Sequence, residues 1–146
     1  NGALNPGNSP GVLTFGSTLN LAGTTTFEID GITRGTLYDG IDVTGVLTNG
    51  GILSLNFGSA FLTGGETFDL FALSGGQSGD FSAIDLIGSY TGSLTNNSGV
   101  WTGTVSGLDF TYTQSTGDLG VVPEPATWAL LAFSLMTVIF FRRRKI

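Results

Sequence analysis

Short runs in which apolar and polar residues alternate cover most of the chain. In one of them Leu53, Leu55 and Phe57 are separated by Ser54 and Asn56, and similar alternation recurs at residues 13–15, 19–21, 27–29, 68–70 and 108–112. A period of two with polar partners predicts β-strands that bury one face. No stretch before Pro125 holds an apolar stripe of helical spacing that is long enough for a helix. We therefore expect an all-β body.

Steps rich in glycine and asparagine separate these runs, and they supply the backbone conformations that tight turns need. All 24 glycines lie at or before Gly120. Many short strands at this spacing fit either a β-solenoid, in which the chain winds and stacks on itself, or a β-sandwich closed by hairpins. The runs resemble one another without a fixed period, so periodicity leaves both architectures open.

The last 26 residues differ from everything before them. Pro123, Glu124 and Pro125 are followed by an uncharged apolar run, residues 126–141, and then by the bases Arg142, Arg143, Arg144 and Lys145. The composition therefore divides the chain into a glycine-rich acidic body, residues 1–120, and a C-terminal segment, residues 121–146.

The apolar run predicts one C-terminal transmembrane helix. As a helix its sixteen residues would rise ~24 Å, against a hydrocarbon core of ~30 Å. The four bases can snorkel to the headgroups, and Trp128 stands where an interfacial aromatic residue belongs. The positive-inside rule places the bases in the cytoplasm and the body outside. The alternatives are a permanent single-pass anchor and, less favoured, a buried C-terminal helix of a soluble protein.

Charge narrows the range of partners. Eleven acidic residues and one base, Arg34, precede Ala126, which gives that part of the chain a net charge of −10. Such a surface repels nucleic acid, whereas the terminal bases suit an anionic membrane face. The chain has no cysteine and no histidine, which excludes disulfides, thiol chemistry and a histidine general base. No initiator methionine opens it, so we expect a C-terminal fragment or a processed product.

Carboxylates are the candidates for chemistry that the body offers. Glu28 with Asp30, or Asp39 with Asp42, could form the acid and base of a glycosidase-like site, but no other convergent group accompanies them. We therefore expect no enzyme and no cofactor. Asp80, in the run GGQSGDF, is the one candidate calcium ligand, although the match to a calcium-binding nonapeptide is partial and occurs once. We expect a solvated turn there and no metal site.

Two aromatic residues lie outside the clear alternation and could bind sugar. Trp101 and Tyr90 could form a stacking surface for a carbohydrate, but strand residues flanked by glycine usually serve packing, and packing is the favoured interpretation. Aromatic residues in phase with their strands are expected in the core.

The body resembles the autotransporter-associated β-strand repeat. The phrases that carry the resemblance, in order, are NPGNSPGVLTF (5–15), TFEID (26–30), DGIDVTG (39–45), GGILSL (50–55), GETFDLF (65–71) and GDF (79–81). The resemblance covers residues 4 to about 82 and implies a right-handed parallel β-helix. It favours the solenoid over the sandwich.

The C-terminal segment resembles the PEP-CTERM sorting signal of exported bacterial proteins, because VPEP, ATWALL, the apolar run and RRRK follow one another at the very end of the chain. The resemblance implies that an exosortase, a membrane protease-transferase, recognises the segment and cuts near Pro123, Glu124 and Pro125. It also implies a transient stay in the inner membrane, then the cell surface or extracellular matrix.

Together these features predict an exported structural or adhesive protein whose partners are the membrane, an exosortase-type enzyme and an extracellular polysaccharide, but not nucleic acid. Two alternatives remain: the C-terminal part of an exported polysaccharide-active enzyme, and a permanently membrane-anchored binding module.

Overall fold

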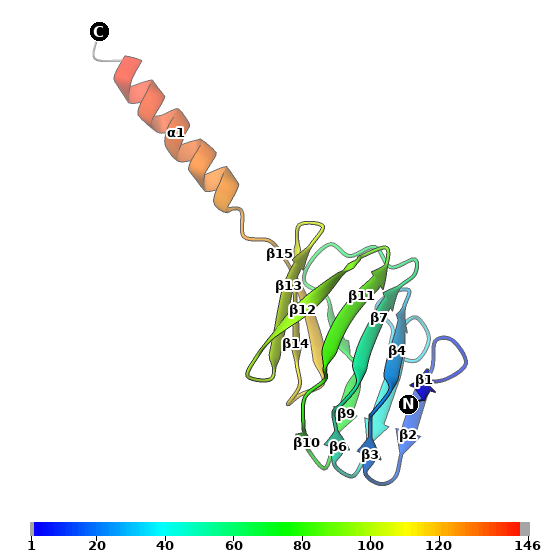
Figure 1. The fold of residues 1–146 in the computed structure, drawn as a ribbon. Coiled ribbons are helices and arrows are strands. Elements are labelled where there is room, and N and C mark those ends of the chain that lie inside the picture. Colours follow the sequence, from blue (N-terminus) through cyan, green and yellow to red (C-terminus); the bar gives the residue numbers. More distant parts are fainter. Residues whose placement is uncertain (1, 144–146) are drawn as a thin grey trace.

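The computed structural model describes residues 2–143, apart from the side chains of residues 127–132 (Figure 1). Strands fill the body and one helix follows them. The elements are β1 (Ala3–Leu4), β2 (Val12–Phe15), β3 (Leu19–Asn20), β4 (Thr24–Ile29), β5 (Gly40–Val43), β6 (Leu47–Thr48), β7 (Ile52–Phe57), β8 (Thr67–Asp69), β9 (Phe71–Leu73), β10 (Gln77–Ser78), β11 (Ala83–Gly88), β12 (Gly92–Asn97), β13 (Val100–Val105), β14 (Leu108–Thr113), β15 (Asp118–Pro123) and α1 (Thr127–Arg143). The prediction of an all-β body is confirmed.

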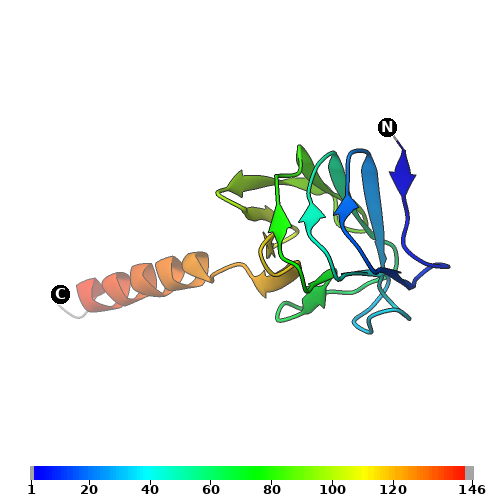
Figure 2. The same ribbon diagram turned by 90° about the horizontal axis from the view of Figure 1, so that it is seen from below.

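Three consecutive segments of chain repeat the same path. Each contributes one strand to each of three parallel ladders, β2-β5-β9, β3-β6-β10 and β4-β7-β11, and β1 adds a further parallel strand beside β4. In the first ladder Leu13 is opposite Ile41, and Ile41 is opposite Phe71. Equivalent residues are about 30 positions apart, the spacing expected when one supersecondary unit stacks on the next. In Figure 2 the equivalent strands lie side by side in the order of the sequence.

The second half of the large sheet is antiparallel. From β11 the order continues through β12, β13, β14 and β15, and β15 then pairs with β8. The nine-stranded sheet is therefore mixed, and its last strands return to a segment that immediately precedes β9. This return places β15 between two neighbours, β14 and β8.

The residues that alternate in the sequence form the core. Phe27, Leu55, Phe57, Phe110 and Tyr112 are fully buried. The Phe57 ring meets the rings of Phe110 and of Tyr90 edge to face, at centroid distances of 5.7 Å and 5.4 Å. Each large apolar side chain buried in this way contributes about 1.5–3 kcal/mol to folding, which is why the phase of the alternation determines the inward face of each strand.

Helix α1 points away from the sheets in both views (Figures 1 and 2). It begins at Thr127, two residues after Pro125, and the large apolar side chains that are described along it, from Phe133 to Phe141, are exposed. No helix among the described residues is long and apolar enough to cross a membrane. The prediction of a transmembrane helix is therefore not supported, because α1 contains 17 residues.

Candidate functional site: the C-terminal segment and its seat on the body

The Pro-Glu-Pro step is not a free tail, because strand β15 continues into it. Pro123 is the last residue of β15 and is opposite Leu108 of β14. The backbone N–H of Glu124 donates to the carbonyl of Gly107 at 3.0 Å. Pro123 thus lies beside the start of β14, and Glu124 is fixed to the β13–β14 turn.

The other edge of β15 is held by β8 and by the loop before it. The N–H of Val121 donates to the Glu66 carbonyl at 2.9 Å, and the N–H of Gly65 donates to the Val121 carbonyl at 2.6 Å. Val121 itself is fully buried. Sheet hydrogen bonds on both edges therefore extend to Val121, two residues before the first proline.

Proline has no backbone N–H to donate, and Pro123 fits this strand because its nitrogen points to the edge of β15 where the sheet hydrogen bonds have already ended at Val121. Backbone groups of successive strand residues point to opposite edges, so Pro123 faces the same side as Val121, away from β14. There the ring packs against Gly64, where an added methyl group would lie 2.5 Å from Pro123 Cδ and 2.6 Å from Cγ. Gly64 also has a positive φ of 86°. Glycine at this position gives the proline its room.

Glu66 holds the loop that carries Gly64. Its carboxylate accepts hydrogen bonds from the Thr63 N–H and hydroxyl, each at 2.8 Å, and from the Gly64 N–H at 2.9 Å. Partial burial by itself would raise the pKa of Glu66, but these hydrogen bonds outweigh it, and the pKa lies below its ordinary value. The charged form of Glu66 thus stabilises the loop of residues 63–66, on which Pro123 packs.

Beyond Glu124 the chain leaves the body. Glu124, Pro125 and Ala126 are exposed and lie between the end of β15 and the start of α1. Arg142 and Arg143 occupy the last turn of α1, where positive charge complements the helix dipole. The side chain of Trp128, and all of Arg144 and Lys145, lie outside the described residues.

The carboxylates considered for catalysis accept hydrogen bonds from residues of the loops and strands around them. Asp39 is buried, and its two carboxylate oxygens accept the N–H groups of Gly11 and Glu28, each at 2.7 Å. Burial raises the pKa of Asp39, and these two hydrogen bonds oppose the shift only in part. Glu28 accepts the Ser9 hydroxyl beside a hollow of about 400 Å³. Asp30 accepts the Ser59 N–H at 2.9 Å, a bond that joins the loop after β4 to the loop after β7.

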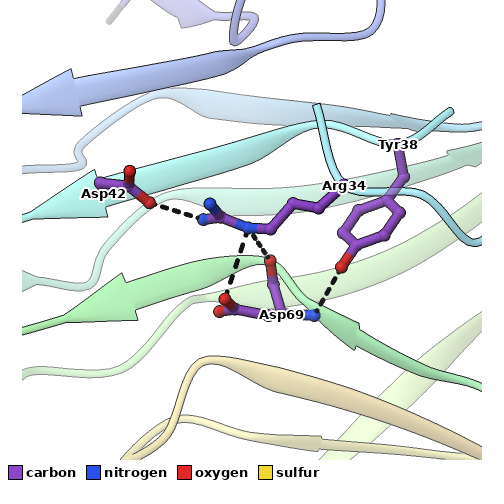
Figure 3. A network of polar contacts seen from close by, with 4 residues as sticks. All are labelled: Arg34, Tyr38, Asp42 and Asp69. Atoms are coloured by element: carbon purple, nitrogen blue, oxygen red, sulfur yellow. Dashed lines mark hydrogen bonds and ion pairs between the residues drawn. The ribbon is translucent and has the colours of Figure 1, made fainter. Parts of the chain in front are cut away.

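Asp42 does not face Asp39 but binds the single base of the body (Figure 3). Arg34 Nη2 lies 2.8 Å from Asp42 Oδ1, and Arg34 Nε donates to the Asp69 carbonyl at 2.7 Å. The Tyr38 hydroxyl accepts the Asp69 N–H at 3.3 Å. The loop between β4 and β5 is thereby fastened to β5 and to Asp69, the last residue of β8. Local patterns could not reveal this cluster, because its members are up to 35 residues apart in the chain.

Asp80 belongs to a hydrogen-bond chain with two partners. Gln114 Nε2 donates to Asp80 Oδ1 at 2.8 Å, and Gln114 Oε1 accepts Trp101 Nε1–H at 2.7 Å. Among the described residues no group of three or more side chains of the kinds that bind metals comes together. Asp80 therefore acts here as an acceptor for Gln114.

The packing role favoured for Trp101 and Tyr90 is confirmed, and the alternative of a sugar-stacking surface is wrong. Trp101 is 5% exposed and Tyr90 is 9% exposed. Trp101 lies opposite the buried Tyr112 on the neighbouring strand, and Tyr90 packs on Phe57 while its hydroxyl accepts the Leu62 N–H at 2.9 Å. Both rings belong to the core, so neither can offer its face to a carbohydrate.

Comparison with known families identifies one part of the chain. Residues 121–145 match the PEP-CTERM protein-sorting motif. Searches of curated proteins and of solved structures give no match. The matched residues are those that begin in β15, pass through Glu124, Pro125 and Ala126 and continue along α1. This chain thus carries a PEP-CTERM sorting motif, which indicates a protein sorted through an exosortase, by way of membrane association, to the cell surface or extracellular space.

Proposed function

We propose that this chain is an exported structural or adhesive protein of the bacterial cell surface or extracellular matrix. Its body is a solenoid of the autotransporter-associated type, and an exosortase-type enzyme removes α1 after the membrane has captured it. The observation that carries the proposal is the PEP-CTERM match over residues 121–145. Pro123, Glu124 and Pro125 are in this view substrate residues.

The arrangement of the body supports the solenoid. Three parallel ladders built from three successive segments are what a winding chain produces, since each turn of a solenoid contacts only its neighbours. Stacking of this kind gives a stiff rod with regular hydrogen bonds, which suits a spacer on a cell surface. The parallel ladders favour this architecture over a sandwich closed by hairpins.

The use of the charged side chains supports a structural role. Asp39, Asp42 and Glu66 are occupied by backbone groups or by Arg34. The acidic body would remain soluble outside the cell and could meet a matrix polysaccharide through cations. The exposed apolar side chains of α1 favour association with a membrane until the helix is removed.

The experiment is expression of the full chain, behind a secretion signal, in a bacterium that makes an exosortase and in the same strain without the enzyme. We expect a shortened protein on the surface of the first strain and the full chain in the membrane fraction of the second. Glu124→Gln should lower processing, whereas Asp118→Asn, which removes the same charge at the start of β15, should not. A surface protein that retains the last 20 residues in both strains would refute sorting by cleavage.

The role of the body is tested on the processed protein. Co-sedimentation with the extracellular polysaccharide of the host, with and without calcium, measures adhesion. Retention in the pellet supports the adhesive role. Release of reducing sugar ends from the polysaccharide would instead identify an enzyme and overturn the structural proposal.

A further inference from the structure

The body and the sorting motif share residues, and this overlap bears on where the chain can be cut. Up to Val121 the chain has a hydrogen-bonded neighbour on both edges. Pro123 packs against Gly64, and the Glu124 N–H is bonded to Gly107. Residues 121–124 of the motif therefore belong to the fold, and the residues after Glu124 lie outside it.

A protease must take its substrate as an extended segment and bring a nucleophile to one face of a peptide carbonyl. A strand whose edges are paired offers neither a free edge nor room above the peptide plane next to the core. Val121 has no exposed surface. Cutting at or before Val122 would require β15 to leave β14, the Gly64 contact and the hydrogen bonds of residues 65 and 66.

The three residues after Pro123 present no such obstacle. Glu124, Pro125 and Ala126 are exposed, and α1 begins only at Thr127. Pro125 disfavours helix in the residue before it. The backbone is consequently held open between two regular elements, at a fixed place relative to both the body and the helix.

We propose that the folded body confines cleavage to the three peptide bonds between Glu124 and Thr127, with Gly64 and β14 as the seat that positions them. This inference rests on the proposed function, because it concerns the same processing step. The carbonyl–nitrogen bond of one of these peptides breaks. The nitrogen leaves with α1 as a new amino terminus, having taken up a proton, and the carbonyl carbon passes to water or to the hydroxyl or amine of an acceptor.

The first test is the intact mass of the body released by cells that make an exosortase. We expect a last residue of Glu124, Pro125 or Ala126. A last residue of Pro123 or earlier would overturn this inference and leave sorting by cleavage intact. A wild-type chain that is never cut would overturn the proposed function itself, so the two failures are distinguishable.

The second test locks β15 in place. Asp109 and Val122 are opposite each other on β14 and β15, on the face away from the core, and the chain has no cysteine of its own. Asp109→Cys with Val122→Cys would join the strands by a disulfide, which the mass of the isolated protein verifies. The two single variants are the controls, since each carries one change and cannot form the internal disulfide.

Membranes that contain an exosortase would receive the locked full chain with and without a reductant. We expect the disulfide form to be processed within about twofold of the reduced form, and with the same C-terminal residue. A tenfold or larger loss of processing in the disulfide form, restored by the reductant, would show that β15 must open and would overturn the inference.

Discussion

Replacing Gly64 by alanine tests whether the body holds the sorting motif. The added methyl group would lie 2.5 Å from Cδ and 2.6 Å from Cγ and N of Pro123. Contacts this short do not occur between unbonded carbons, and the atoms met are a ring and the backbone, which cannot swing aside. Either the loop at Gly64 or the chain at Pro123 must move. Glu66 fixes the loop through three hydrogen bonds, so we expect Pro123 to yield.

The magnitude has two parts. A non-glycine residue at the φ of 86° of Gly64 costs about 1–2 kcal/mol. Displacing Pro123 removes the hydrogen bond from Glu124 to Gly107, worth about 1 kcal/mol, and part of the ring contact. The neighbouring Gly65 has a φ of 111° but no atom near an added methyl group. Gly65→Ala therefore carries the strain without the clash and serves as the matched control.

Amide hydrogen exchange read by mass spectrometry on the full chain in detergent measures the effect. We expect the peptide that contains Val122 and Glu124 to exchange about five- to tenfold faster in Gly64→Ala, because about 1 kcal/mol of local protection is lost. In Gly65→Ala the exchange rate of this peptide, compared with that of the rest of β15, should be the same as in the wild type. Equal exchange of this peptide in both variants would refute the claim that Gly64 seats Pro123.

Three further predictions concern the body, and urea unfolding of the full chain in detergent, followed by circular dichroism, checks each. Tyr112→Phe should raise the free energy of unfolding by about 1 kcal/mol, because the buried Tyr112 hydroxyl has no hydrogen-bond partner among the described residues. Tyr90→Phe should lower the free energy of unfolding by a similar amount, because it leaves the Leu62 N–H without its acceptor. Arg34→Met should cost about 1 kcal/mol, a value kept small because its ion pairs are partly exposed; no change would show that the cluster in Figure 3 contributes nothing. The pKa of Glu66 is lowered in the folded protein, so its contribution to the free energy of unfolding is complete above the ordinary glutamate pKa and disappears as the pH falls through the folded pKa. Glu66→Gln should therefore weaken the loss of stability at acid pH. An unchanged dependence of stability on pH would contradict the role assigned to Glu66.

The alternation of apolar residues predicted the strands well because it reflects burial directly. Leu53, Leu55 and Phe57 are all fully buried in β7, as their period of two requires. The burial of Trp101 could not be predicted from alternation in the same way. Its strand is antiparallel to β14, and the register that places it opposite Tyr112 is set by a turn whose exact length decides the face. A shift of one residue would have exposed the ring.

The junction between the body and the C-terminal segment was hidden for a related reason. Composition changes at Gly120, yet β15 runs from Asp118 to Pro123 across that point. Its partner on one side, β8, lies about fifty residues earlier in the chain, a separation that local patterns do not report. A proline also reads as the end of a strand, and only the position of Gly64 shows why this one can close β15 without breaking it.

The point of cleavage and the stability of the body are therefore linked through β15. Leu119 and Val121 are fully buried, and the strand stands between β14 and β8. A cut after Glu124 would leave that strand, its core side chains and the Glu124–Gly107 hydrogen bond in the released protein. A cut before Val121 would remove a buried side chain and leave the N–H of Gly65 and the carbonyl of Glu66 without their partner in β15, and unpaired groups at a sheet edge invite pairing with other chains. A motif that overlaps the last strand by a few residues thus lets one protein be held at the membrane, be severed from it, and keep its fold.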